Sequence, residues 1–161
     1  MVDDSRGAPS GDVYEWFQRA EKLLAEGNPD AALQLLYRVR DEDSSTSVLE
    51  ALARALFDAR KYVEAESVFR ELCERTPSDD FAHYGLGISL WRMQEFTLAR
   101  DELAMAFVMR PESPEYGKAL GQVRATLRAR AEAGLPPNGP VSPPAPAAGS
   151  TPYITFEVDG E

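Results

Sequence analysis

Hydrophobic residues recur along residues 13–134 at spacings typical of amphipathic helices. Leu49, Leu52, Ala53 and Leu56 fall at positions i, i+3, i+4 and i+7, which places them on one face of a helix. Comparable runs precede and follow this one, and short polar stretches separate them. The pattern predicts an all-α chain.

A second apolar face follows in the same stretch of chain. Arg60 and Lys61 mark the turn before it, and Pro77 ends it because proline cannot continue a helix. The face consists of Val63, Ala65, Val68, Phe69 and Leu72. The unit is therefore a pair of helices.

Helix ends are marked by capping residues. Asp12 with Glu15, and Ser47 with Glu50, match the capping box, in which the two side chains bind each other's free backbone amides. Gly27 can adopt the left-handed conformation that ends a helix. These signals predict helices beginning just after Asp12 and Ser47.

The helix pair is repeated with a period of 33 or 34 residues. Four parallel series share that period: Ala20, Ala53 and Gly87; Leu23, Leu56 and Leu90; Ala32, Ala65 and Ala99; and Leu36, Phe69 and Leu103. The small residues in these series let the two helices of a pair approach closely.

This pattern resembles the tetratricopeptide repeat, a 34-residue helix–turn–helix unit. The resemblance implies a right-handed α–α superhelix of three helix hairpins, at about residues 13–45, 46–79 and 80–113. A capping helix at residues 114–134 would follow. Together these segments form the expected repeat domain, residues 13–134.

Both termini differ in composition from the repeats. We expect a disordered N-terminus at residues 1–12 and a Pro/Ala-rich linker at residues 135–152, because seven of the 12 prolines lie between positions 136 and 152. Residues 153–161 are β-prone, with Ile154 and Phe156 on one side. That segment is either a frayed terminus or a docking motif for a partner or the protein's own groove. We therefore expect a monomer or weak self-association through the tail.

Charge and composition exclude several classes of protein. The 161 residues carry a net charge of −10, which disfavours general binding to nucleic acid or anionic membranes. Residues 1–7 are acidic and polar, unlike a signal peptide, so a cytoplasmic location is expected. The excess of arginine over lysine and the abundance of alanine suggest a bacterial source.

Candidate chemistry is sparse. The sequence has no nucleophile motif, phosphate loop or metal-ligand spacing, and we expect no catalytic residues, no cofactor and no metal. The single histidine, His83, and the single cysteine, Cys73, are interpreted as packing residues. The protein is therefore predicted not to be an enzyme.

The resemblance implies that the first helices of the hairpins line a concave groove for a partner peptide or helix. Tyr, Trp and Arg, which dominate binding hot spots, are frequent there. Phe57 and Phe81 also hold groove positions but are expected to complete the core. The candidate partner-binding residues are Tyr14, Phe17, Glu21, Glu50, Arg54, Tyr84, Ile88, Trp91, Arg92 and Lys118.

The family's chaperone-binding members grip a C-terminal carboxylate with Lys, Asn and Arg. Here those positions hold Phe17, Glu21, Ala51, Phe81 and Gly85, so a co-chaperone role is not expected. The predicted function is a non-catalytic adaptor or scaffold that binds a protein or peptide.

Two alternatives remain open. Residues 114–134 carry four basic and two acidic side chains, so a regulator could use Arg124, Arg128 and Arg130 to contact RNA or an acidic partner. The other is a subunit that stabilises an enzyme complex.

Overall fold

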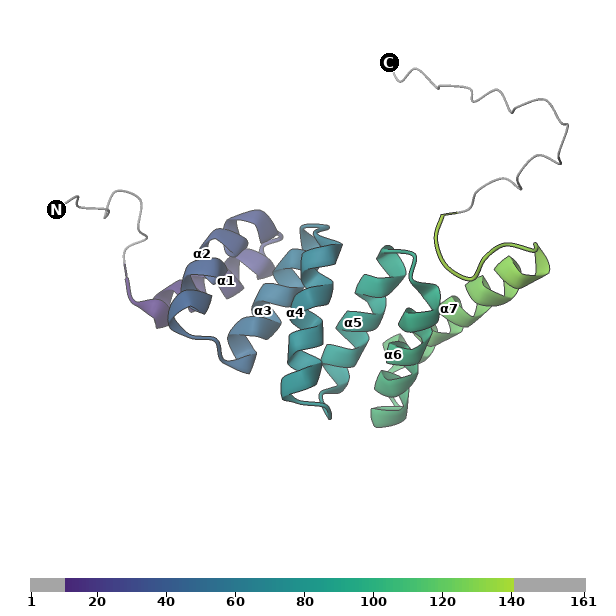
Figure 1. Cartoon of the computed structure of the whole chain (residues 1–161). Coiled ribbons are helices and arrows are strands. Elements are labelled where there is room, and N and C mark those ends of the chain that lie inside the picture. Colours follow the sequence, from purple (N-terminus) through teal and green to yellow (C-terminus); the bar gives the residue numbers. More distant parts are fainter. Residues whose placement is uncertain (1–10, 141–161) are drawn as a thin grey trace, which may run out of the picture.

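The computed structural model describes residues 11–140, which form seven helices and no strand. The helices follow one another as antiparallel hairpins (Figure 1). They are α1 (Val13–Ala25), α2 (Pro29–Glu42), α3 (Thr46–Asp58), α4 (Tyr62–Arg75), α5 (Asp80–Arg92), α6 (Phe96–Met109) and α7 (Pro114–Glu132). The predicted all-α chain of three hairpins and a capping helix is confirmed. The β-prone segment 153–161, most of the linker and most of residues 1–12 lie outside the described residues.

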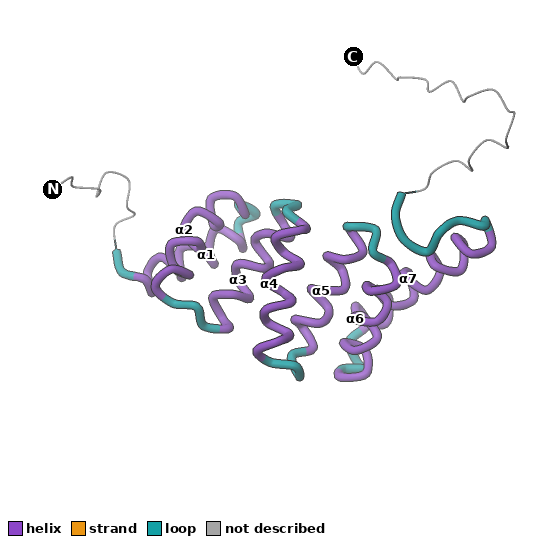
Figure 2. The backbone as a smooth tube through the Cα atoms, in the orientation of Figure 1, coloured by secondary structure: helices purple, strands orange, loops and turns teal. Residues whose placement is uncertain are grey.

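The hairpins stack into a solenoid with an inner and an outer row of helices. α1 contacts α3, α3 contacts α5, and α5 contacts α7, whereas the described backbones of α2, α4 and α6 do not approach one another. Figure 2 shows the resulting row of helix pairs joined by short turns. Helices that touch on one side and separate on the other curve the stack, so the first helices lie on its concave side.

Small residues set the spacing within each hairpin. Ala20, Ala53 and Ala99 are fully buried. At Gly87, an added Cβ would lie 2.6 Å from Cγ of Leu103, closer than real Cβ contacts. The repeated small positions are therefore the points where the helices of a pair approach most closely.

The capping signals are confirmed in part. Glu15 donates its backbone N–H to Asp12 at 2.9 Å, and both halves of that capping box are present. The Ser47–Glu50 box is wrong, because α3 begins at Thr46, one residue before Ser47, with Ser45 at its N-cap.

The turn inside each hairpin uses a left-handed residue at an equivalent position. These residues are Gly27, with φ of 79°, Arg60, with φ of 61°, and Gln94, with φ of 63°. The role of Gly27 was predicted, whereas Arg60 and Gln94 carry no sequence signal for a positive φ.

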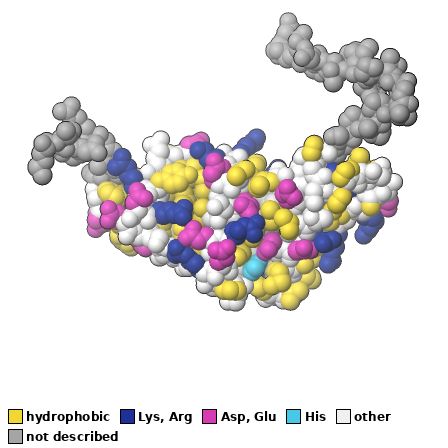
Figure 3. All heavy atoms as spheres, in the orientation of Figure 1, with side chains coloured by type: hydrophobic (Ala, Val, Ile, Leu, Met, Phe, Trp, Pro, Cys, Tyr) yellow, Lys and Arg dark blue, Asp and Glu magenta, His cyan; other side chains and the backbone are white. Residues whose placement is uncertain are grey.

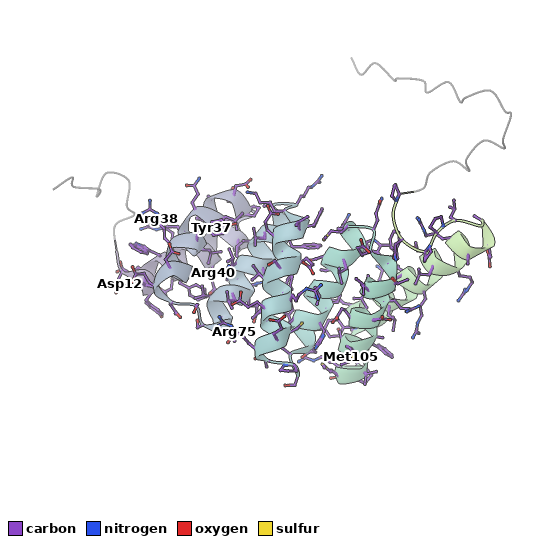
Figure 4. The ribbon with its side chains drawn as sticks, viewed as in Figure 1. Asp12, Tyr37, Arg38, Arg40, Arg75 and Met105 are labelled. Carbon is purple, nitrogen blue, oxygen red and sulfur yellow. The ribbon has the colours of Figure 1, made fainter. Side chains whose placement is uncertain are left out.

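Several apolar side chains on the second helices face solvent. Val63, which the periodicity places on a buried face, is 64% exposed because it lies in the first turn of α4, on the outer side. Leu98, Met105 and Val108 of α6 are also exposed. Hydrophobic side chains gather in patches on the face seen in Figure 3, and Figure 4 shows the position of Met105 on α6. An ion pair also joins two helices of the outer row, between Arg40 of α2 and Glu71 of α4 at 2.9 Å.

The chain does not leave the solenoid at the end of α7. Residues 135–139, here called the strap, fold back to the start of α6, and Gly139 donates its N–H to the carbonyl of Gln94 at 2.9 Å. Asn138 accepts the backbone N–H of Thr97 at 2.9 Å. The composition predicts a linker here, whereas the described part of that segment is held by long-range hydrogen bonds.

The strap also changes the interpretation of the cap. Arg130 is 5% exposed, and it donates to the carbonyls of Pro136 and Asn138 at 2.7 and 3.0 Å. Its guanidinium lies over the ring of Phe96, 5.2 Å from the centroid. The basic face expected from Arg124, Arg128 and Arg130 therefore lacks Arg130, whose guanidinium is buried and bonded within the protein.

None of the described helices combines the length and the apolar character needed to cross a lipid bilayer.

Candidate functional site

Three hollows follow one another along the first helices. The hollow between α1 and α3 has a volume of about 340 Å³, that between α3 and α5 about 240 Å³, and that between α5 and α7 about 250 Å³. Arg54 and Asp58 line the first two, and Phe57, Tyr84 and Ile88 line the last two. Because neighbouring hollows share side chains, they form one continuous groove.

The middle hollow is mostly apolar. At Gly85, an added Cβ would lie 2.2 Å from the ring of Phe69, so the missing side chain lets this ring reach the groove. Phe81 packs edge-on against Phe69, with ring centroids 6.1 Å apart. Leu103, from the second helix of the next hairpin, lines the adjoining hollow. The floor of the groove is thus built partly by second helices.

Tyr84 stands between the middle and last hollows. Its ring stacks on Tyr116 at a centroid distance of 4.8 Å, and burial raises the pKa of its hydroxyl. The Tyr116 hydroxyl in turn donates to Asp80 at 2.7 Å, which fixes the stacked pair. A rigid aromatic wall of this kind suits binding without a large loss of side-chain entropy.

The far end of the groove presents Trp91 and Arg92. Trp91 packs edge-on against Phe96, at a centroid distance of 5.3 Å. The exposed Arg92 lies 5.8 Å from the ring centroid of Tyr62, so it forms a charged rim beside an aromatic surface.

Acidic and basic side chains lie together at the opposite end of the groove, between α1 and α3. Glu21 and Arg54 form an ion pair at 3.5 Å between α1 and α3. Burial raises the pKa of the neighbouring Glu50, and the charges of Asp79 and Glu21 add to that rise while Arg54 opposes it. This end can meet either sign of ligand charge.

The structure brings together six of the ten candidate residues in the groove: Glu21, Arg54, Tyr84, Ile88, Trp91 and Arg92. The other four candidates line none of these three hollows. Tyr14 is 66% exposed and its hydroxyl accepts from Gln18, Phe17 packs on the core, Glu50 lies half-buried beside the charged end, and Lys118 is exposed.

Other groove residues were not among the candidates. Phe57 and Phe81, assigned to the core, pack on it and also line the groove. Phe69 and Leu103 are second-helix residues, and their periodicity shows only that they are buried. Gly85, a glycine within a helix, is a sequence signal that could have indicated the close approach of the Phe69 ring.

A second cluster lies outside the groove. Cys73, His83 and Glu102 bring their Sγ, imidazole and carboxylate atoms within 4.8 Å of one another, in the described part of the chain. The two ring nitrogens of His83 are 2.7 Å from Glu102 and 2.9 Å from the Pro77 carbonyl, so neither is free to take the thiol proton.

The environment of Cys73 also opposes nucleophilic chemistry. Burial, with the charges of Glu102 and Asp79, raises the pKa of the thiol to about 12. Reactive cysteines need the opposite shift, because the thiolate is the nucleophile. The cluster therefore lacks the properties of a cysteine–histidine catalytic pair.

Comparison with known proteins agrees with this architecture. Residues 23–80 match the sequence profile of the tetratricopeptide repeat family. No curated protein is significantly similar to the chain in sequence.

Solved structures show the same fold. The first tetratricopeptide domain of Spaghetti (RPAP3), bound to the HSP90 peptide SRMEEVD, superposes with a TM-score of 0.68 at 19% identity, over 74% of this chain and 96% of that one. A crystal structure of MamA gives 0.69 at 19% identity, over 78% and 74%. The second such domain of human RPAP3, in complex with an HSP70 peptide, gives 0.64 at 16% identity, over 70% and 98%.

The stacked hairpins and the continuous groove thus define an α-helical repeat solenoid. Residues 23–80 carry the tetratricopeptide repeat profile, and the solenoid has the fold of tetratricopeptide repeat domains.

Proposed function

We propose that the protein is a non-catalytic, cytoplasmic adaptor or scaffold that binds a peptide or helix of a partner in this groove. The observation that carries the proposal is the row of three connected hollows with an apolar, aromatic centre. Concave sites of this kind bury apolar side chains of a ligand and use a few polar groups for orientation.

The structural neighbours support a peptide as the ligand. Two of them, the RPAP3 domains, are complexes with HSP90 and HSP70 peptides. The carboxylate-gripping positions of chaperone-binding relatives hold Phe17, Glu21, Ala51, Phe81 and Gly85 here, which offer no cationic side chain. We therefore propose an apolar or mixed ligand rather than an acidic C-terminus.

The groove suggests how such a ligand would be oriented. Apolar ligand side chains would fill the middle hollow between Phe57, Phe81 and Ile88. The Glu21–Arg54 pair at one end and Arg92 at the other would set direction, since charges at a rim contribute more to specificity than to affinity.

A peptide-display selection against the full chain tests the proposal. Peptides enriched on the wild type are then titrated against Ile88→Lys, which places a charge between two hollows. We expect Kd to rise at least ~tenfold, about 1.4 kcal/mol, while circular dichroism stays unchanged. Val108→Lys makes the same exchange at a site 76% exposed outside the groove and should leave Kd unaltered.

The proposal fails if enriched peptides bind Ile88→Lys as tightly as the wild type. It also fails if Val108→Lys is the variant that loses binding, because the site would then lie on the outer face.

A further inference from the structure

The chain's only cysteine and only histidine meet in space with a carboxylate. Cys73 lies on α4, His83 on α5 and Glu102 on α6, and their ligand atoms lie within 4.8 Å of one another. These three residue types are the usual protein ligands of zinc. Small shifts of the side chains would bring these atoms to one metal ion, whose ligand atoms lie roughly 3.5 Å apart.

The hydrogen bonds of His83 fix how its ring could act. Its Nε2 lies 2.9 Å from the carbonyl oxygen of Pro77. A carbonyl can only accept, so Nε2 carries the proton and donates it. Nδ1 faces Glu102 at 2.7 Å and is left as the ligand atom. Metal-bound histidines commonly donate their other ring N–H to a backbone carbonyl in this way.

We propose that Cys73 Sγ, His83 Nδ1 and a carboxylate oxygen of Glu102 form a site for one Zn²⁺ ion. A borderline-soft ion suits a mixed sulfur, nitrogen and oxygen set, whereas Mg²⁺ and Ca²⁺ require oxygen ligands. Water would complete a tetrahedron at the fourth position. Binding releases the thiol proton, and the proton between His83 and Glu102, to solvent.

Solvent can reach the site even though His83 itself is 8% exposed. Cys73 is partly exposed, and the Glu102 side chain keeps 27% of its accessible surface. An ion can therefore enter without opening the solenoid.

The consequence is structural. The three ligands come from three successive helices, α4, α5 and α6, so a bound ion would tie the second hairpin to the third. An ion that binds only the folded chain raises its apparent stability. This role is independent of the groove, since none of the three ligands lines any of its three hollows.

Metal-free full-length protein, prepared with EDTA and a reductant, tests the site. Adding zinc at ~100 times Kd should raise Tm by about 5–10 °C, with one ion bound per chain, and EDTA should reverse the rise. Co²⁺ should produce a thiolate-to-cobalt charge-transfer band, which requires a Cys73–metal bond.

Matched variants separate the site from nonspecific binding. Cys73→Ser and Glu102→Gln should each lose the zinc-dependent rise in Tm, and Cys73→Ser should lose the charge-transfer band. Glu74→Gln, which removes an exposed carboxylate next to Cys73, should keep both.

The proposal is overturned if zinc leaves the Tm of the wild type unchanged, or if the rise persists in Cys73→Ser. Circular dichroism checks that Cys73→Ser and Glu102→Gln remain folded. If either unfolds, protection of Cys73 from alkylation by zinc in the wild type decides, and equal alkylation rates with and without zinc refute the site.

Discussion

Each hairpin turns at one residue in the left-handed region, and the three residues differ in their suitability for it. Gly27 adopts a φ of 79° without steric cost, whereas Arg60 and Gln94 carry a Cβ at φ near 60°. That conformation costs an L-residue roughly 1–2 kcal/mol. The same turn is therefore relaxed in the first hairpin and strained in the second and third.

Exchanging these residues should change stability in opposite directions. No atom lies within 4 Å of a Cβ at Gly27, so Gly27→Ala adds backbone strain alone and should lower the free energy of unfolding by about 1 kcal/mol. Arg60→Gly should relieve the backbone strain and raise the free energy of unfolding by less than ~1 kcal/mol. Urea denaturation measures both, and a stabilising Gly27→Ala would contradict the strain argument.

The half-buried carboxylate of Glu50 predicts a pH dependence. The pKa of Glu50 is raised in the folded state, so the folded protein favours the protonated carboxyl. The stability that this protonation gives is fully present below the ordinary pKa of 4.5 and is lost as the pH rises through the folded pKa. Glu50→Gln should therefore raise the free energy of unfolding at pH 7 by under ~1 kcal/mol, since the group is partly solvated. The gain should vanish below pH 4.5, as thermal unfolding at both pH values can show.

At the scale of elements, α6 is capped by a residue distant in sequence. Glu95 stands at its N-cap without a side-chain hydrogen bond, and the free N–H of Thr97 is bound by Asn138 of the strap at 2.9 Å. Helix ends need such partners, because their first amides have none within the helix. The strap thus performs at α6 the task that Asp12 performs at α1.

Removing this cap should destabilise the third hairpin. Asn138→Ala should lower the free energy of unfolding by ~1 kcal/mol, the usual cost of a lost N-cap, and should speed amide exchange at the start of α6. Asn138→Asp keeps the accepting oxygen and adds a charge that suits a helix N-terminus, so its stability should stay within ~0.5 kcal/mol of the wild type. Equal losses in both variants would contradict a capping role.

Sequence patterns predicted the elements better than their long-range contacts. Helices and repeats follow from spacings within about 34 residues, which the chain displays directly. The strap was missed because proline and glycine composition predicts a linker, while the bond from Asn138 to Thr97 spans 41 residues. The Cys73–His83–Glu102 cluster was missed for the same reason, because its members come from three different helices.

The candidate site shows the same limit. Tyr84, Ile88, Trp91 and Arg92 follow from the first helices lining the concave side. The contribution of Phe69 depends on how closely its ring approaches Gly85, which periodicity cannot give.

At the scale of the molecule, the charges of the groove do not favour an acidic peptide. Its Glu21 end carries several carboxylates, and the gripping positions lack cations. The peptide SRMEEVD, to which the Spaghetti (RPAP3) domain is bound, should therefore show no measurable binding to this protein in fluorescence anisotropy. Binding with a micromolar Kd would overturn the proposed preference for apolar or mixed ligands.

The strap determines where the rest of the chain starts. Gly139 is bonded to Gln94, two residues beyond Arg92 at the rim of the groove, whereas residue 11 lies at the opposite end of the solenoid (Figure 1). A peptide joined directly after residue 140 through a short flexible linker is tethered beside the groove, at an effective concentration on the order of millimolar. A weak ligand can therefore be trapped for crystallisation by C-terminal fusion, while affinity tags for binding assays belong at the N-terminus.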